Sequence, residues 1–378
     1  MFADTPIVRR EPPDENEFLL TLGIDLEETP YEAIEVIGRG AMGAVVGVRH
    51  KRTGLPFVVK VLHDSADAEM VQRLQNEARV LGRLSHPNLL VVHDLGTTTT
   101  GRAYLVTERL RGQTFDELLK ARGALPWQEA VDMVVQALRG LAVAHEAGVV
   151  HRDVKTSNLF LSNALLDGKR IVKVLDFGIV KVQHGGVGPL ATMSPREQET
   201  AAGMIVGTPR FLSPEQIRAE RIDARSDIYG VGVVLYCLLV GRAPFQAKTL
   251  LDLVRAHIET PAPAPSAAAP FPLPPALDRA VKKALEKDAA DRFATATEMA
   301  DELERIARPS TDRVQAPLVA APTPKPPVAG STASALAMGE GPPSTQVRLP
   351  QRPWIAPLAI ILSVTAIILV LIDMLTRR

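Results

Sequence analysis

Apolar residues between positions 31 and 62 fall into three short segments with the composition of β-strands. They are rich in Val and Ile, and turns that contain glycine separate them. Their bounds are 31–37, 44–49 and 56–62. A helical pattern follows over 67–84, and beyond Leu118 the sequence is mainly helical in pattern, with short strands near 159–161 and 171–175. The pattern predicts an α+β fold in which a small β-rich lobe precedes a larger helical lobe.

A different pattern begins after residue 308. Residues 309–353 are rich in Pro, Ala, Ser and Thr, a composition that cannot bury a core, and we expect a disordered linker there. Residues 354–372 carry no charge and are mostly Ile, Leu, Val or Ala. A helix of that length rises roughly 28 Å, about the thickness of the hydrocarbon layer of a bilayer. We therefore predict one transmembrane helix over 354–375, with a buried core helix or an oligomerisation helix as the alternatives.

Composition narrows the classes of function. Lys+Arg and Asp+Glu each number 43, and this zero net charge argues against a nucleic-acid partner, which a basic excess would accompany. The chain has one cysteine, Cys237, which excludes an internal disulfide and a Cys-rich zinc site. With 46% hydrophobic residues, the chain can bury a large core. Residues 1–30 are acidic and lack a sustained apolar run, so we interpret them as an N-terminal extension and expect no signal peptide.

The first candidate motif is a G-x-G-x-x-G pattern made by Gly38, Gly40 and Gly43. Glycines allow a backbone to approach phosphates closely, with N–H groups facing the oxygens. A dinucleotide-binding fold would place a helix after this motif. Here the β-branched residues Val45 and Val46 follow, which favours a hairpin that covers phosphates. A plain structural turn is the alternative.

The second candidate is Lys60, which lies near the end of an apolar strand pattern. An unpaired lysine is costly to bury, so a partner is expected. Glu77 occupies a position on the apolar stripe of the pattern over 67–84, where a leucine would be typical. Lys60 and Glu77 are therefore candidates for an ion pair, and the alternative is that Glu77 lies at the edge of the stripe in water.

Two further motifs place charged residues between apolar segments. In the first, Asp153 can accept a proton, Asn158 can bind a metal ion through its amide oxygen, and Lys155 can neutralise phosphate charge. In the second, Asp176 follows an apolar strand pattern and precedes Phe177-Gly178, which suits a ligand of a divalent cation. A surface loop and a turn-forming aspartate are the respective alternatives.

Together and in this order, these motifs resemble the signature set of the protein kinases. The resemblance covers about residues 31–308 and includes several later motifs. They are Gly207-Thr208-Pro209, Ser213-Pro214-Glu215, Asp227-Ile228-Tyr229-Gly230 and Asp291-Arg292-Phe293. The sequence is most similar to the bacterial eukaryotic-like (Hanks-type) Ser/Thr protein kinases, which often join a cytoplasmic kinase to one membrane span. This resemblance implies a bilobal protein-kinase fold and protein substrates.

The resemblance also implies a role for each matching residue. Asp153 would be the catalytic base with Lys155 beside it, and Lys60 would hold the phosphates of ATP while paired with Glu77. The ligands of Mg²⁺, or of Mn²⁺ in its place, would be Asn158 and Asp176. ATP would contact Gly38, Arg39, Gly40, Ala41, Met42, Gly43, Val45, Val58, Lys60, Thr107, Glu108 and Leu110.

Other residues are expected to act by packing. The resemblance makes His151 and Phe177 packing residues of a regulatory spine. It makes Glu215 and Arg292 a buried ion pair of the large lobe. It places Cys237 in a central apolar helix, where the thiol would be inert.

Regulation is expected to act through Arg152, which precedes the catalytic base. An arginine there lacks a counter-charge until a phosphate in the following segment pairs with it. The resemblance implies autophosphorylation in trans, and with it a homodimer in which one chain phosphorylates the other. The candidate phosphosites are Thr200, which is favoured, with Ser194 and Thr192.

These expectations combine into a membrane-anchored kinase that transfers the γ-phosphoryl of MgATP to protein Ser/Thr hydroxyls. The chain would lie in the cell membrane as a single-pass protein, held in the lipid bilayer by its C-terminal helix, with the kinase domain in the cytoplasm. A membrane-tethered pseudokinase scaffold is the main alternative, although no residue needed for catalysis is missing. A small-molecule phosphotransferase is the second alternative, disfavoured because such enzymes generally lack the motifs at 207–209 and 213–215.

Overall fold

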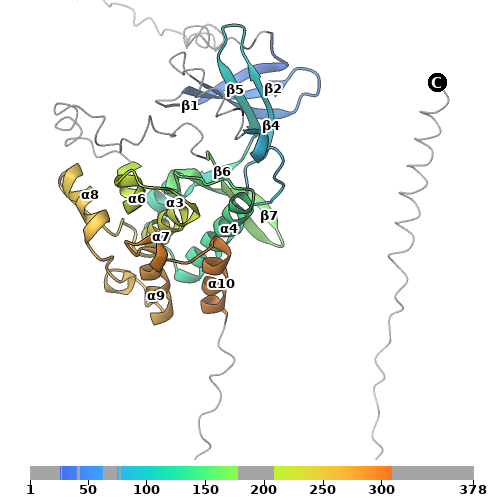
Figure 1. Cartoon of the computed structure of the whole chain (residues 1–378). Helices are drawn as coiled ribbons and strands as arrows, with labels where there is room; N and C mark the ends of the chain where they lie inside the picture. The colour runs from blue at the N-terminus through green and yellow to red at the C-terminus, as the bar shows by residue number, and fades with distance from the viewer. Residues whose placement is uncertain are drawn as a thin grey trace, which may run out of the picture. The chain divides into compact units, whose positions relative to one another are not determined.

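The computed structural model of the chain describes residues 26, 28–40, 43–62, 75, 78–177 and 208–308. These residues belong to the first of two units into which the chain divides, Met1–Val314 and Gln315–Arg378. Within the first unit, a small β-sheet lobe is followed by a larger, mainly helical lobe (Figure 1). The predicted α+β architecture and the order of its two lobes are therefore confirmed.

Five antiparallel strands form the sheet of the small lobe, in the order β1-β2-β3-β5-β4. The strands are β1 (Tyr31–Gly40), β2 (Gly43–His50), β3 (Pro56–Leu62), β4 (Val92–Thr97) and β5 (Ala103–Glu108). The three strands that the apolar pattern predicts correspond to β1, β2 and β3. Side chains alternate between the two faces of a strand, and one face of this sheet carries a row of fully buried valines. They are Val46, Val48, Val59, Val61 and Val106.

The large lobe contains a three-stranded sheet and seven of the described α-helices. The sheet has the order β6-β7-β8, with β6 (Gly112–Thr114), β7 (Leu159–Leu166) and β8 (Lys169–Val174). The helices are α3 (Phe115–Arg122), α4 (Trp127–Glu146), α6 (Pro214–Ile217), α7 (Ala224–Val240), α8 (Leu250–Glu259), α9 (Pro275–Ala284) and α10 (Ala296–Ala307). Short 3₁₀ turns are η1 (Thr156–Asn158), η2 (Thr208–Phe211), η3 (Pro265–Ala267) and η4 (Ala289–Asp291).

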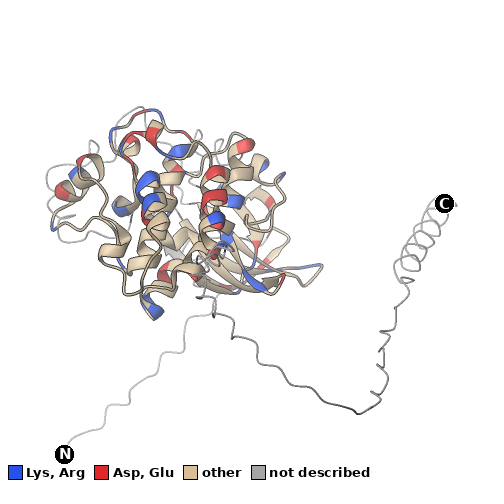
Figure 2. Cartoon of the chain, turned by 90° about the horizontal axis from the view of Figure 1, so that it is seen from below, with Lys and Arg blue, Asp and Glu red and all other residues tan. Residues whose placement is uncertain are grey.

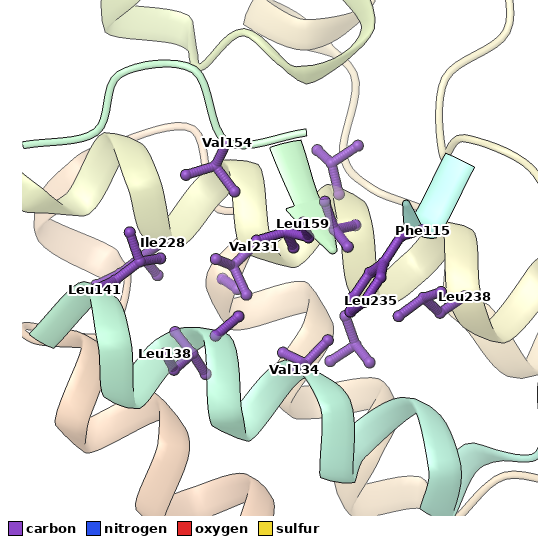
Figure 3. Packing of buried hydrophobic residues seen from close by; sticks show 14 of the residues in the cluster. Phe115, Val134, Leu138, Leu141, Val154, Leu159, Ile228, Val231, Leu235 and Leu238 are labelled. Carbon is purple, nitrogen blue, oxygen red and sulfur yellow. The ribbon is translucent and has the colours of Figure 1, made fainter. Parts of the chain in front are cut away.

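Helix α7 is the centre of the large lobe, and all its residues from Ser226 to Val240 are buried. In Figure 3 the side chains of α4 face those of α7 across the core. Close packing requires Gly230, because a Cβ there would lie 2.9 Å from the Cβ of Val154. Cys237 lies within α7, and burial raises the pKa of its thiol to about 12, as expected for an inert cysteine.

Charged residues of both signs are interspersed along the helices (Figure 2). Several form ion pairs between elements that are distant in sequence. Arg139 of α4 binds both Asp301 and Glu304 of α10, at 2.6 and 2.9 Å. Lys283 of α9 binds Glu298 of α10 at 2.8 Å. Exposed pairs of this kind contribute about 1 kcal/mol or less each, so the apolar core dominates the stability of the lobe.

Glu215 and Arg292 form the buried ion pair that the sequence predicts. Two hydrogen bonds of 2.8 Å join the guanidinium to the carboxylate, and Ser226 donates a third from 2.5 Å. Burial alone would raise the pKa of Glu215, but its hydrogen bonds with Arg292 and the charge of Arg292 lower it to about 2. The pair therefore keeps its charge and joins α6 to the chain that follows η4.

His257 is a second buried polar group of this lobe, and it connects three elements. Its Nδ1 lies 2.9 Å from the hydroxyl of Tyr229 in α7, and its ring packs against Phe245. Burial, together with the positive charge of Lys287, lowers the pKa of His257 to about 3, although a hydrogen bond with the backbone of Arg210 acts in the opposite direction. His257 is therefore neutral at physiological pH and joins α8 to α7 and to η2.

Several predicted segments lie outside the described residues. They include the linker over 309–353, the transmembrane helix over 354–375 and most of the extension over 1–30. Of the helix predicted over 67–84, residues 75 and 78–81 are described and are helical. No helix among the described residues is long and apolar enough to cross a membrane.

Acidification below pH 6.5 is expected to destabilise the large lobe through His257. The pKa of His257 is about 3 in the folded chain, against 6.5 for an ordinary histidine. The unfolded chain therefore binds a proton that the folded chain excludes, and stability falls by about 1.4 kcal/mol for each pH unit below 6.5. Urea unfolding at pH 7, 6 and 5 measures this slope.

The matched control is His257→Asn, which cannot be protonated at this position. Its unfolding free energy should be lower at pH 7, and it should fall less steeply on acidification. His86, whose pKa burial also lowers, is present in both proteins, so its contribution cancels in the comparison. Equal slopes in the two proteins would contradict the assignment.

Candidate active site

A buried carboxylate in the first turn of α7 anchors the loop that carries Asp153. Asp227 accepts hydrogen bonds of 2.8 Å from the backbone N–H groups of His151 and Arg152. It also lies 2.7 Å from Nε2 of His145 in α4. The residue is only 2% exposed, and the positive end of the helix dipole adds to these contacts. Asp227 therefore fixes the loop over residues 151–158 to the core of the large lobe.

The loop brings together the three polar residues that the sequence singled out. Lys155 Nζ lies 2.8 Å from the carboxylate of Asp153, and Asn158 Nδ2 lies 3.1 Å from the same oxygen. Asn158 also donates to the carbonyl of Asp153 at 2.9 Å. A carboxylate held by a lysine and an amide is positioned to accept a proton from a hydroxyl group close to a phosphate.

The orientation of Asn158 suits it to a metal site. Because its amide nitrogen donates to Asp153, its amide oxygen is the atom available to a cation. The N–H of Leu175 donates to the carbonyl of Asn158 at 2.8 Å, which brings the chain just before Asp176 against Asn158. One amide oxygen and one carboxylate suit Mg²⁺, which takes its remaining ligands from phosphates and water. No group of three His, Cys, Asp or Glu side chains that could hold a metal by itself occurs among the described residues.

Lys60 of β3 reaches across to the large lobe and pairs with Asp176. Its Nζ lies 3.0 Å from Oδ1 of Asp176, and the two side chains are 27% and 50% exposed. Asp176 has a φ angle of 38°, in the left-handed region that a residue with a Cβ rarely adopts. Glu77, the partner predicted for Lys60, lies outside the described residues. The contact shows that Lys60 faces Asp176, which is one of the two candidate metal ligands.

Strand register places four of the predicted ATP contacts on one face of the small lobe. Val45 of β2 pairs with Lys60 of β3, and Val58 pairs with Thr107 of β5. Because Val58 and Lys60 are two residues apart, their side chains lie on the same face. Leu110 lies two residues beyond the end of β5, where the chain passes to the large lobe. The face that Lys60 shares with these residues is therefore the candidate nucleotide-binding surface.

Two glycines of the β1–β2 hairpin are needed for different reasons. A Cβ on Gly43 would lie 1.9 Å from the carbonyl oxygen of Val61, so this position requires glycine for close approach to β3. A Cβ on Gly38 would meet no atom within 4 Å, so the fold itself does not require glycine there. The space at Gly38 suits a ligand that approaches the backbone. Arg39 and Gly40 are described only in their backbone, and Ala41 and Met42 lie outside the described residues.

Sequence reasoning missed Lys173, which connects the two lobes. This residue of β8 is 8% exposed, and its Nζ lies 2.7 Å from the carboxylate of Glu108 and 3.0 Å from the carbonyl of Leu89. Glu108 also accepts from the N–H of Val91 at 2.9 Å. The carboxylate of Glu108 is thus used within the protein, and so is its backbone N–H, which donates to the carbonyl of Val91 at 3.1 Å. The signal in the sequence was a lysine between buried valines in a strand.

His151 and Phe177 pack as the resemblance implies. Their ring centroids lie 4.7 Å apart, and His151 is fully buried. His151 Nε2 lies 2.7 Å from the carbonyl of Leu175, and its Nδ1 accepts from the N–H of Asp153 at 3.2 Å. These contacts make His151 a structural link between the loop that carries Asp153 and the segment that carries Asp176. The candidate phosphosites Thr192, Ser194 and Thr200 lie outside the described residues.

The fold has a β-sheet lobe and a helical lobe, and Lys60 of the sheet meets the loops that carry Asp153 and Asp176. This arrangement is typical of a protein kinase. The family model for the protein kinase domain matches residues 31–303, so the chain belongs to the protein kinase family. Bacterial Ser/Thr kinases are among its relatives. It is 36% identical to the Serine/threonine-protein kinase pkn3 of Myxococcus xanthus, over 73% of this chain and 50% of the relative.

Further relatives agree with this placement. The chain is 34% identical to the Serine/threonine-protein kinase PknB of Mycolicibacterium smegmatis, over 73% of this chain and 43% of that protein. It resembles the crystal structure of the PknI kinase domain of Mycobacterium tuberculosis with a TM-score of 0.55 and 26% identity, over 73% of this chain and 96% of that one. The chain spans half or less of the length of these two curated relatives.

The contrast between Gly38 and Gly43 predicts two different phenotypes. Gly38→Ala should leave the melting temperature unchanged and raise the dissociation constant of MgATP about tenfold, because the added methyl group enters the ligand's space. Gly43→Ala should destabilise the small lobe itself, since its Cβ overlaps the backbone of β3. Thermal melting and fluorescent-nucleotide titration measure the two effects.

Gly54→Ala is the control for backbone conformation alone. Gly54 has a φ angle of 69°, and a Cβ there would meet nothing within 4 Å. Its substitution should cost about 1 kcal/mol of stability and leave nucleotide affinity unchanged. Unaltered MgATP affinity in Gly38→Ala would argue against the proposed approach of the ligand to this hairpin.

Proposed function

We propose that this chain is an active kinase that transfers the γ-phosphoryl group of MgATP to Ser and Thr hydroxyls of proteins. The observation that supports this most directly is that Lys155 and Asn158 bind the carboxylate of Asp153, at 2.8 and 3.1 Å. The contact between Lys60 and Asp176 at 3.0 Å brings the nucleotide-facing strand to the same place. The groups that phosphoryl transfer needs, Asp153, Lys60 and Asp176, are therefore all present.

Each residue of the site has one role in this proposal. MgATP supplies the phosphoryl group and the cation that offsets its charge. Asp153 accepts the proton of the attacking hydroxyl, and Lys155 neutralises charge that develops on the phosphoryl group beside it. Asn158 and Asp176 hold the cation through oxygen atoms, and Lys60 holds the phosphates of the nucleotide. Charge neutralisation and positioning account for the catalysis, and no covalent enzyme intermediate is needed.

Activation by autophosphorylation belongs to the same proposal. Nε of Arg152 is buried and has no hydrogen-bond partner among the described residues. Arg152 directly precedes Asp153, so a phosphate that paired with its guanidinium would stabilise the loop that carries the base. Thr200, Ser194 and Thr192 are the proposed acceptors. Because one molecule would phosphorylate another, the proposal includes a transient homodimer.

Anchoring in the cell membrane is also proposed, on the composition of the sequence. The uncharged apolar stretch over 354–372 has the length of a membrane span, and a Pro- and Ala-rich stretch separates it from the kinase domain. ATP dependence then places the kinase domain in the cytoplasm. The pseudokinase alternative is not favoured, because Lys60, Asp153 and Asp176 are all retained.

Incubation of the full-length chain with MgATP is expected to produce phosphoserine or phosphothreonine, both on the chain and on a general substrate such as casein. Asp153→Asn should lower the rate at least about 100-fold, because the base is lost while the shape of the loop is kept. Removal of Mg²⁺ with EDTA should abolish transfer. Mass spectrometry of tryptic peptides identifies the sites, and a variant with near wild-type activity would refute the role of Asp153.

Deletion of residues 354–378 is expected to release an active kinase from the membrane. The full-length chain should sediment with membranes and require detergent for extraction, whereas the shortened chain should remain in the supernatant. Replacement of 354–378 by an unrelated apolar span is the matched control and should restore sedimentation. A shortened chain that still sediments with membranes would show that the anchor lies elsewhere.

A further inference from the structure

Gln216 of α6 contacts the peptide group that immediately precedes Asp153. Its Nε2 donates to the carbonyl oxygen of Arg152 at 2.7 Å, and the residue is only 8% exposed. We propose that Gln216 is a positioning residue for catalysis, which fixes this peptide and thereby sets the direction in which Asp153 presents its carboxylate. This inference rests on the proposed function, because that function assigns Asp153 as the base.

The orientation of the Gln216 amide follows from its two partners. The backbone N–H of Ser213 can only donate, and it lies 3.0 Å from Oε1 of Gln216. The carbonyl of Arg152 can only accept, and it faces Nε2. Both contacts therefore require the same placement of oxygen and nitrogen. One orientation of the amide therefore accepts from the N–H of Ser213 and donates to the carbonyl of Arg152 at the same time.

The catalytic loop needs such a contact because Arg152 has an unfavourable backbone conformation. Its φ angle is 63°, in the left-handed region, which persists in a residue with a Cβ only when neighbouring groups hold it. Asp227 holds the N–H of Arg152 at 2.8 Å. Gln216 holds its carbonyl from the other side. Without the contact from Gln216, the bond that remains on this peptide among the described residues is from the N–H of Asp153 to Nδ1 of His151, at 3.2 Å. The peptide can then tilt, and the carboxylate moves with it.

A role in capping alone does not account for the choice of glutamine. Gln216 completes a capping box with Ser213 at the start of α6, and that function uses only Oε1. A glutamate at the same position would cap the helix equally well. The amide nitrogen is the part that differs, and it is the atom that reaches Arg152. Gln216 also lines a small pocket beside Asp153, together with Phe211 and Leu212.

The test compares Gln216→Glu and Gln216→Met in the full-length chain, with casein and MgATP. Glutamate keeps the cap and loses the donor, whereas methionine loses both without adding a charge that Arg152 could attract. Both variants are expected to lower kcat about tenfold or more, because small errors in positioning a reacting group are costly. The KM for ATP should stay within about twofold, since the nucleotide face of the small lobe is untouched.

Two further measurements separate positioning from a loss of folding. The kcat of the variants should become insensitive to solvent viscosity, as expected when the chemical step limits the rate. Thr295→Ala is the matched control for stability, because Thr295 caps α10 through the N–H of Glu298, and α10 contributes no residue to the site. It should lower the melting temperature and leave kcat unchanged.

The outcomes distinguish this inference from the proposed function. Wild-type kcat in Gln216→Glu and Gln216→Met would overturn the positioning role while the kinase assignment stands. A decrease in kcat that follows the melting temperature, with an equal change in the KM for ATP, would also overturn it. A wild-type chain no more active than Asp153→Asn would overturn the proposed function itself, and the inference with it.

Discussion

The site depends on one buried carboxylate. Asp227 lies in the first turn of a helix that is buried from Ser226 to Val240, so burial of its carboxylate is costly unless hydrogen-bond donors surround it. The donors include two backbone N–H groups of the catalytic loop. Burial of α7 and placement of the loop are therefore coupled, because the loop supplies hydrogen bonds that the buried Asp227 needs. Through this coupling, the apolar core holds the proposed catalytic groups in place.

The two lobes meet through a few polar contacts that differ in burial. Lys173 is almost fully buried and binds Glu108 at 2.7 Å, next to the point where the chain passes between the lobes. Lys60 and Asp176 meet in a more exposed setting, where solvent weakens their attraction. The lobes are thus held firmly at Lys173 and more loosely at the candidate active site. A nucleotide and cation that bind there as proposed would replace the Lys60–Asp176 contact at low cost.

Much of this could be predicted from the sequence because the signals were local. Val and Ile in short runs predicted β1, β2 and β3, but β4 and β5 of the same sheet were not predicted. The spacing of Asp153, Lys155 and Asn158 placed them on one loop. Lys173 was missed because a lysine in a strand is usually solvated, and only the folded chain brings Glu108 and Leu89 to it. Gln216 was missed because its pattern is that of a helix cap. Its second contact, with Arg152, joins residues 64 positions apart.

Cys237 can report when the core of the large lobe becomes exposed. It is the one thiol of the chain, it lies in the most deeply buried helix, and burial suppresses its thiolate form. An alkylating reagent can therefore react only after α7 becomes exposed, so the rate of labelling measures how often the large lobe opens. A cysteine introduced on the surface would carry a dye without competition from the native one. The two lobes could then be tracked by fluorescence in an otherwise unaltered sequence.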